Sequence, residues 1–113
     1  MFVAEIVEGC VGSRLNLTCK EMKVIQIVAV VLGDSYCSPV SCCIKYSRCT
    51  YFANESHTAD VHRRCDNKNS CTVTVVQERI PCASWGWWVA DNHFERITYV
   101  CVDYPRCKLD IFY

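Results

Sequence analysis

The sequence predicts a small, disulfide-rich α+β domain, with an antiparallel sheet of about five strands, one or two short helices and long loops. Three observations lead to this prediction. The chain has 113 residues and 11 cysteines, and cysteine near a tenth of a short chain is typical of a disulfide scaffold. Several segments alternate apolar and polar residues with period two, which indicates half-buried strands. One segment has the pattern of a short helix.

Four segments have strand character. Residues 14–19 alternate polar residues with Leu15, Leu17 and Cys19, and residues 24–31 are rich in β-branched side chains, which favours a more buried strand. Gly33-Asp34 then reads as a turn. The other two strands are residues 71–76 and 94–101. In the last one, Phe94, Arg96, Thr98 and Val100 occupy one face, while Ile97, Tyr99 and Cys101 occupy the other.

One helix is expected between these strands. Ser56 is a candidate N-cap and residues 59–64 form its body, because the hydroxyl of a capping serine can accept from the first free backbone amides. The helix should end near Cys65, before the turn-forming residues 66–69. Cysteines run from Cys10 to Cys107, so residues 10–107 are predicted to be one domain. Residues 1–9 and 108–113 are predicted to be edges or linkers.

Composition excludes several classes of protein. Twelve basic and twelve acidic residues cancel, so a nucleic-acid partner is not expected. The longest apolar stretch, residues 24–32, is far shorter than the roughly 20 residues of a membrane helix, so direct membrane insertion is not expected. No phosphate-binding, hydrolase or zinc-finger motif occurs, so no enzyme activity, metal or cofactor is expected. The many cysteines indicate an oxidising, extracellular setting.

Four cysteine-containing motifs resemble the rhamnose/galactose-binding lectin domain of the sea-urchin-egg-lectin type. Residues 10–19 match its C-x-G-S-x-L-x-L-x-C opening. Residues 63–71 match its Q-R-C-x5-C segment, Pro81-Cys82 its P-C pair, and residues 97–101 its final V-x-Y-x-C strand. The resemblance covers about residues 10–101. It implies an antiparallel lectin-like scaffold.

The resemblance also implies a disulfide pairing, which spacing alone does not assign. The family pattern, carried over to this sequence, gives Cys10–Cys37, Cys19–Cys101, Cys49–Cys82 and Cys65–Cys71. Three cysteines remain outside this set. Adjacent cysteines rarely bond each other, so Cys107 is expected to pair with Cys42 or Cys43, which leaves one thiol over.

Family lectins hold a sugar with a glutamate after the first cysteine, a Y-G-R turn, an aspartate before P-C and a lysine before the last strand. The corresponding positions here are degenerate: Val11, the turn Leu32, Gly33 and Asp34, then Ile80 and His93. Apolar replacements leave sugar hydroxyls without hydrogen-bond partners, at roughly 1–3 kcal/mol each. The scaffold is therefore expected to be retained and the usual sugar site lost.

The segment after Cys82 is about six residues longer than the family pattern and carries Trp85, Trp87, Trp88 and Asp91. Tryptophan is enriched at interface hot spots, so these four residues are candidate partner-binding residues. Filling the core is the main alternative role for the tryptophans, and stacking on a sugar ring is another. Asn16 and Asn54 begin N-glycosylation sequons, and Asn54 is favoured because its surroundings are polar.

The resemblance leads us to expect an extracellular protein–protein recognition module, excised from a longer cell-surface receptor or adhesion protein. Latrophilins and axon-guidance co-receptors use similar domains for protein contacts. The expected partner is another extracellular protein, either a receptor or a secreted ligand. Two alternatives stay open. One is a galactose- or rhamnose-type lectin with a rebuilt pocket and weak glycan binding, and the other is a secreted disulfide-rich inhibitor.

Overall fold

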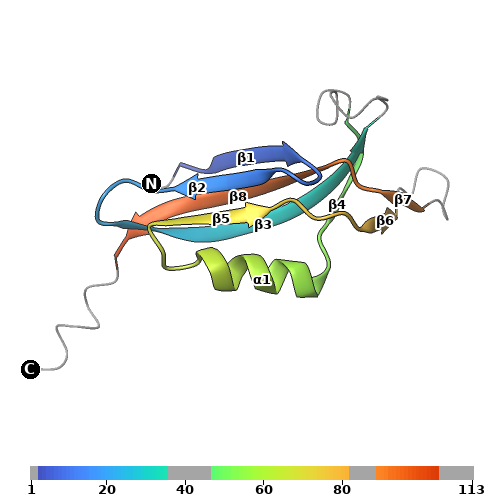
Figure 1. Ribbon diagram of the computed structural model, residues 1–113. Helices are drawn as coiled ribbons and strands as arrows, with labels where there is room; N and C mark the ends of the chain where they lie inside the picture. The colour runs from blue at the N-terminus through green and yellow to red at the C-terminus, as the bar shows by residue number, and fades with distance from the viewer. Residues whose placement is uncertain (1–2, 36–46, 82–88, 105–113) are drawn as a thin grey trace, which may run out of the picture.

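The described part of the chain folds into a small domain made mostly of antiparallel strands, with one helix (Figure 1). The computed structural model describes residues 3–35, 47–81 and 89–104. Within these ranges the elements, in chain order, are β1 (Glu5–Cys10), β2 (Arg14–Thr18), β3 (Lys23–Ser35), β4 (Ser47–Phe52), α1 (Glu55–Cys65), β5 (Ser70–Thr74), β6 (Arg79–Pro81), β7 (Val89–Asp91) and β8 (Phe94–Asp103).

The described strands form three antiparallel sheets. Two of them stack as layers, and the third lies at one end of the molecule (Figure 1). The largest has the strand order β1-β8-β3-β4, and the pairs β2–β5 and β6–β7 form two-stranded sheets. The β2–β5 pair lies over one face of the four-stranded sheet, and α1 runs along the β3 and β5 side (Figure 1). Alternate residues of β2 and β8 therefore face each other across one core.

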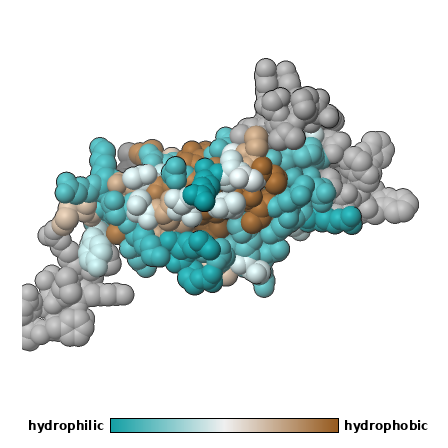
Figure 2. Space-filling model, in the orientation of Figure 1, coloured by the Kyte–Doolittle hydropathy of each residue, from teal (hydrophilic) through white to brown (hydrophobic). Residues whose placement is uncertain are grey.

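The core between the layers is apolar and closed. Its members come from β2, β3, α1, β5 and β8, as their alternation requires: Leu15, Leu17, Cys19, Ile25, Ile27, Val30, Val61, Cys65, Val73, Val75, Ile97 and Tyr99. Full burial of each large aliphatic side chain contributes about 1.5–3 kcal/mol. The solvent-facing residues of β2 and β5 are polar and exposed, and the hydropathy-coloured view looks onto this pair (Figure 2).

The helix begins earlier than the sequence predicts. Its N-cap is Asn54, not Ser56, because Asn54 Oδ1 accepts from the His57 backbone amide at 2.8 Å. Val61 and Cys65 lie on its buried face. On its exposed face the Asp60 carboxylate contacts both Arg63 and Arg64, which are the one-turn spacings that stabilise helices.

Two further predictions need correction. The described residues hold eight strands, so the domain is mostly β, with more strands than the five expected. Gly33-Asp34 is not a turn, because β3 continues through it with β8 and β4 paired on either side. The Phe94 ring lies so close to Gly33 that a Cβ there would overlap it.

Two disulfides join described residues, Cys19–Cys101 and Cys65–Cys71. Both are pairs that the lectin resemblance implies. Cys10 and Cys49 are also disulfide-bonded, and their implied partners Cys37 and Cys82, like Cys42, Cys43 and Cys107, lie outside the described ranges.

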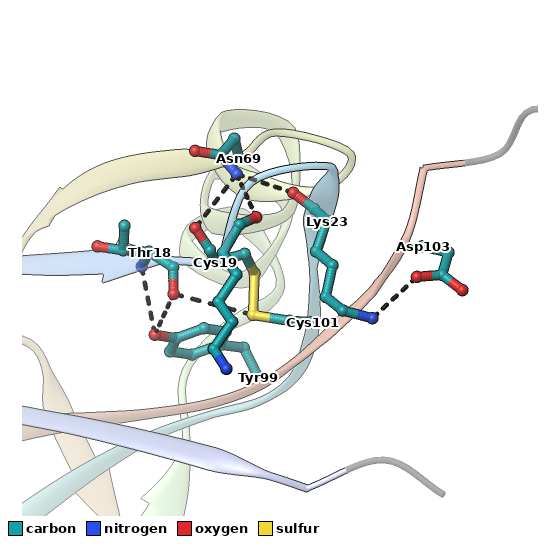
Figure 3. The surroundings of a disulfide bond; sticks show 8 residues. Thr18, Cys19, Lys23, Asn69, Tyr99, Cys101 and Asp103 are labelled. Atoms are coloured by element: carbon teal, nitrogen blue, oxygen red, sulfur yellow. Dashed lines mark hydrogen bonds and ion pairs between the residues drawn. A yellow bond between two sulfur atoms is a disulfide. The ribbon is translucent and has the colours of Figure 1, made fainter.

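Hydrogen bonds surround the Cys19–Cys101 bridge (Figure 3). Asn69 Nδ2 lies within 3.2 Å of the backbone carbonyls of Cys19, Lys20 and Lys23. The Tyr99 hydroxyl accepts from the Thr18 amide and donates to the Thr18 carbonyl, both at 3.2 Å. The Tyr99 contacts tie the end of β2 to β8 next to the covalent link, and the Asn69 contacts fix the connection between β2 and β3.

The two bridges should differ in their contribution to stability. Cys19–Cys101 spans 82 residues and Cys65–Cys71 spans 6. In the chain-entropy model their removal costs roughly 4 and 2 kcal/mol, respectively. We expect urea unfolding of the paired serine variants to show about twice the loss for the longer loop. Equal losses would contradict this explanation of how the bridges act.

Candidate functional site

Four residues that the lectin resemblance singles out come together in space although they are far apart in the sequence: Val11, Gly33, Asp34 and His93. The Val11 amide donates to the His93 carbonyl at 3.0 Å, and the His93 amide donates to the Gly33 carbonyl at 2.7 Å. The His93 imidazole Nδ1 lies 3.0 Å from Asp34 Oδ1. The start of the β1–β2 connection, the far half of β3 and the residue before β8 therefore meet at one place.

The polar groups at this place bind each other. Asp34 is only 1% exposed and pairs with His93, whose side chain is 41% exposed. His93 Nδ1 also lies 3.1 Å from both the backbone nitrogen and the hydroxyl of Ser35. Serine and aspartate thus share one ring nitrogen, whereas a catalytic triad uses the two nitrogens separately. The Asp34 carboxylate is engaged inside the protein.

Two other positions of this set belong to the apolar interior. Leu32 and Ile80 are 0% and 2% exposed and form a small cluster with the half-buried side chains of Cys49, Ala53 and Val76. Buried aliphatic side chains offer a sugar neither a donor nor an acceptor. Packing and internal polar contacts therefore occupy the positions that the lectin resemblance singles out.

A buried polar network that the sequence prediction missed lies beside this place. Glu95 is fully buried. Its Oε2 accepts from His57 Nε2 of α1 at 2.8 Å, and its Oε1 accepts from the Val76 amide at 3.3 Å. The alternation of residues 94–101 was the available signal, because it places Glu95 on the same buried face as Ile97 and Tyr99.

Asn92 also binds the segment from Val76 to Glu78. Its Nδ2 donates to the Val76 carbonyl at 2.8 Å and its Oδ1 accepts from the Glu78 amide at 2.6 Å. The segment from Val76 to Glu78, between β5 and β6, is thus fixed by two buried side chains next to β8. Since Asn92 is 0% exposed, satisfying its amide is a condition of folding.

The hydrogen bond with Glu95 raises the pKa of His57 above its ordinary value of 6.5. Burial acts in the opposite direction, and the negative charges of Glu95, Glu78 and Asp60 raise the pKa further. The charged imidazolium is favoured because a buried carboxylate next to it would otherwise be uncompensated.

The start of α1 and the Val76–Glu78 segment enclose an open polar pocket of about 330 Å³. Its lining residues are mostly charged or hydrogen-bonding: Asn54, Ser56, His57, Asp60, Arg63, Val76 and Glu78. No group of three potential metal ligands occurs within the described part of the chain.

Three strands of the four-stranded sheet carry exposed apolar side chains. Ile6 of β1 and Phe52 of β4 are 58% and 70% exposed, and Val28 in the β3 bulge is 58% exposed. Val28 and Phe52 line an open, mostly apolar groove beside α1, together with Ala53 and Ala59. Ile6 lies on the edge strand β1, which β8 and β3 separate from β4.

The β6–β7 hairpin carries the last of the predicted partner-binding residues. Asp91 is exposed and lies 4.0 Å from Arg79 Nε. Trp85, Trp87 and Trp88 lie between β6 and β7 in the sequence, outside the residues that the structure describes. Both sequon asparagines, Asn16 and Asn54, are exposed.

Comparison of the sequence with protein-family models and with curated proteins gives no match. Among the described residues, no helix is long and apolar enough to cross a membrane.

The His57–Glu95 pair predicts a stability that depends on pH. Because the folded-state pKa of His57 is raised, protonation stabilises the fold fully below pH 6.5, and this contribution is lost as the pH rises through the folded pKa. Urea midpoints measured from pH 6 upward should fall in the wild type.

The matched control is the Glu95→Gln variant, which lacks the carboxylate that raises the pKa of His57. We expect the urea midpoint of this variant to fall less than that of the wild type as the pH rises. An identical pH profile in both proteins would be inconsistent with the ion pair.

Proposed function

We propose that this chain is a divergent, lectin-like α+β module of the rhamnose/galactose-binding type that recognises another extracellular protein. In this proposal the module belongs to a cell-surface receptor or adhesion protein. It acts without catalysis and without a cofactor, by presenting its surface on a rigid, cross-linked scaffold.

One observation carries the proposal. The positions that would bind sugar in such a module meet at one place, but their side chains serve the fold: Leu32 and Ile80 are in the interior, and Asp34 is paired with His93. A monosaccharide placed there would lose several hydrogen bonds at roughly 1–3 kcal/mol each. That loss is comparable to the whole binding energy of a millimolar ligand, about 4 kcal/mol.

The disulfides support the extracellular part of the proposal. Cys19–Cys101 joins the residue after β2 to β8, and Cys65–Cys71 joins the end of α1 to β5. Such bridges persist in oxidising compartments and are rare in the cytosol.

The surface supports a protein partner. The exposed face of β2–β5 is polar, whereas Val28 and Phe52 line a mostly apolar groove beside α1. We assign the main contact to residues 82–91. This part of the sequence contains the three tryptophans and ends at Asp91 of β7. Large aromatic side chains dominate the energy of protein interfaces.

A screen of the purified, disulfide-bonded chain against cell-surface and secreted proteins tests this proposal. We expect a saturable protein partner, and we expect Trp87→Ala with Trp88→Ala to weaken its binding at least about 30-fold, the effect of losing one hot spot. A Thr72→Ala variant on the polar β2–β5 face is the matched control and should bind as the wild type does. Full binding by the tryptophan variant would overturn the assignment of the contact.

A further inference from the structure

The polar pocket at the start of α1 contains hydrogen-bonding groups without partners. Glu78 is half-buried, and its carboxylate has no hydrogen-bond or ion-pair partner within the described part of the chain. Its backbone is fixed, since Asn92 Oδ1 accepts from its amide at 2.6 Å and the Asn92 amide donates to its carbonyl at 3.0 Å. The backbone of Glu78 is thus fixed at the wall of the pocket.

The opposite wall of this pocket begins with Asn54 and Ser56. Asn54 Oδ1 accepts from the His57 amide as the helix cap, while Asn54 Nδ2 donates to none of the described residues. Asn54-Glu55-Ser56 is an N-glycosylation sequon. The amide nitrogen that glycosylation modifies is therefore available without loss of the cap.

We propose that Asn54 carries an N-linked glycan and that its first sugar, an N-acetylhexosamine, occupies the pocket between α1 and the Val76–Glu78 segment. The Glu78 carboxylate accepts from sugar hydroxyls, and the Arg63 guanidinium and Ser56 hydroxyl offer donors. This inference rests on the extracellular location in the proposed function.

The modification is a glycosyl transfer from a polyprenyl-diphosphate oligosaccharide, the donor of the secretory pathway. A bond forms between Asn54 Nδ2 and C1 of the first sugar, and the bond between C1 and the diphosphate oxygen breaks. The amide nitrogen loses one proton, and the polyprenyl diphosphate leaves. No oxidation or reduction takes place.

The second sequon offers a useful contrast. Asn16 lies in the middle of β2, on the flat polar face, and its Oδ1 accepts from the Thr72 hydroxyl at 3.0 Å. Asn54, in contrast, lines a pocket in which the Glu78 carboxylate makes no hydrogen bond or ion pair with any described residue and acts on His57 only through its charge. We therefore use an Asn16→Gln background, in which only the Asn54 sequon remains.

Intact mass tests whether Asn54 is modified. The full chain, with the Asn16→Gln change, is secreted from cells that perform N-glycosylation. We expect one glycan mass, lost in Ser56→Ala, which removes the sequon and leaves the Asn54 cap, and retained in Ser56→Thr. A secreted, disulfide-bonded chain without a glycan at Asn54 would overturn the inference.

Enzymatic trimming tests whether the first sugar occupies the pocket. An endoglycosidase that removes the rest of the glycan and retains only this first sugar on Asn54 should not change Tm. An amidase that removes the first sugar as well should lower Tm by about 4 °C, which corresponds to the loss of one net hydrogen bond in a domain of this size. The amidase converts Asn54 to aspartate, which caps equally well. Asn54→Asp should therefore match the amidase product.

Glu78→Ala is the control for the pocket itself. In this variant, removal of the first sugar should change Tm by much less than in the parent. The same fall in both proteins would show that the sugar does not contact Glu78. Partner binding is measured separately, so a failed glycan experiment leaves the proposed recognition function standing, and a failed partner screen leaves the glycan result standing.

Discussion

The buried Glu95 carboxylate is the constraint on which the arrangement of this domain depends. A carboxylate with no exposed surface must be compensated, and here the compensation comes from two separate elements. His57 supplies a charged partner from α1, and the Val76 amide supplies a donor from the segment after β5. The helix and this segment are therefore positioned relative to β8 by one side chain, and the polar pocket between them follows from that placement.

The positions singled out by the proposed lectin resemblance are also used inside the fold. Asp34 and His93 contact each other, with Ser35 adjacent. Leu32 and Ile80 form a second, smaller apolar cluster. Under the proposed function, these positions therefore contribute to stability and not to sugar binding. The proposed recognition of a protein then relies on the surface beyond them.

Sequence patterns predicted the parts of the fold that local alternation determines. Leu15 and Leu17 face the core as expected, and residues 94–101 present their two faces as predicted. The turn expected at Gly33-Asp34 failed because pairing with two neighbouring strands and the packing of Phe94 override a local turn signal. The strands β6 and β7 have three residues each, too few for alternation to reveal.

The candidate site was likewise predictable from the sequence only in part. The resemblance selected Val11, Asp34 and His93, which do lie together, but it did not reveal that the side chains of Asp34 and His93 contact each other. The His57–Glu95 contact joins residues 38 positions apart, and no local pattern specifies such a pairing. Burial of Glu95 was readable from the strand period, whereas its partner required the packed helix.

The most direct test of the central claim is a residue-resolved NMR titration of the intact chain with rhamnose and with galactose. The account predicts no saturable shift at the amides of Val11, Asp34 and His93, because their side chains are engaged in the fold or apolar. Saturable shifts at these amides, with a common dissociation constant, would contradict it and establish a sugar site at this place.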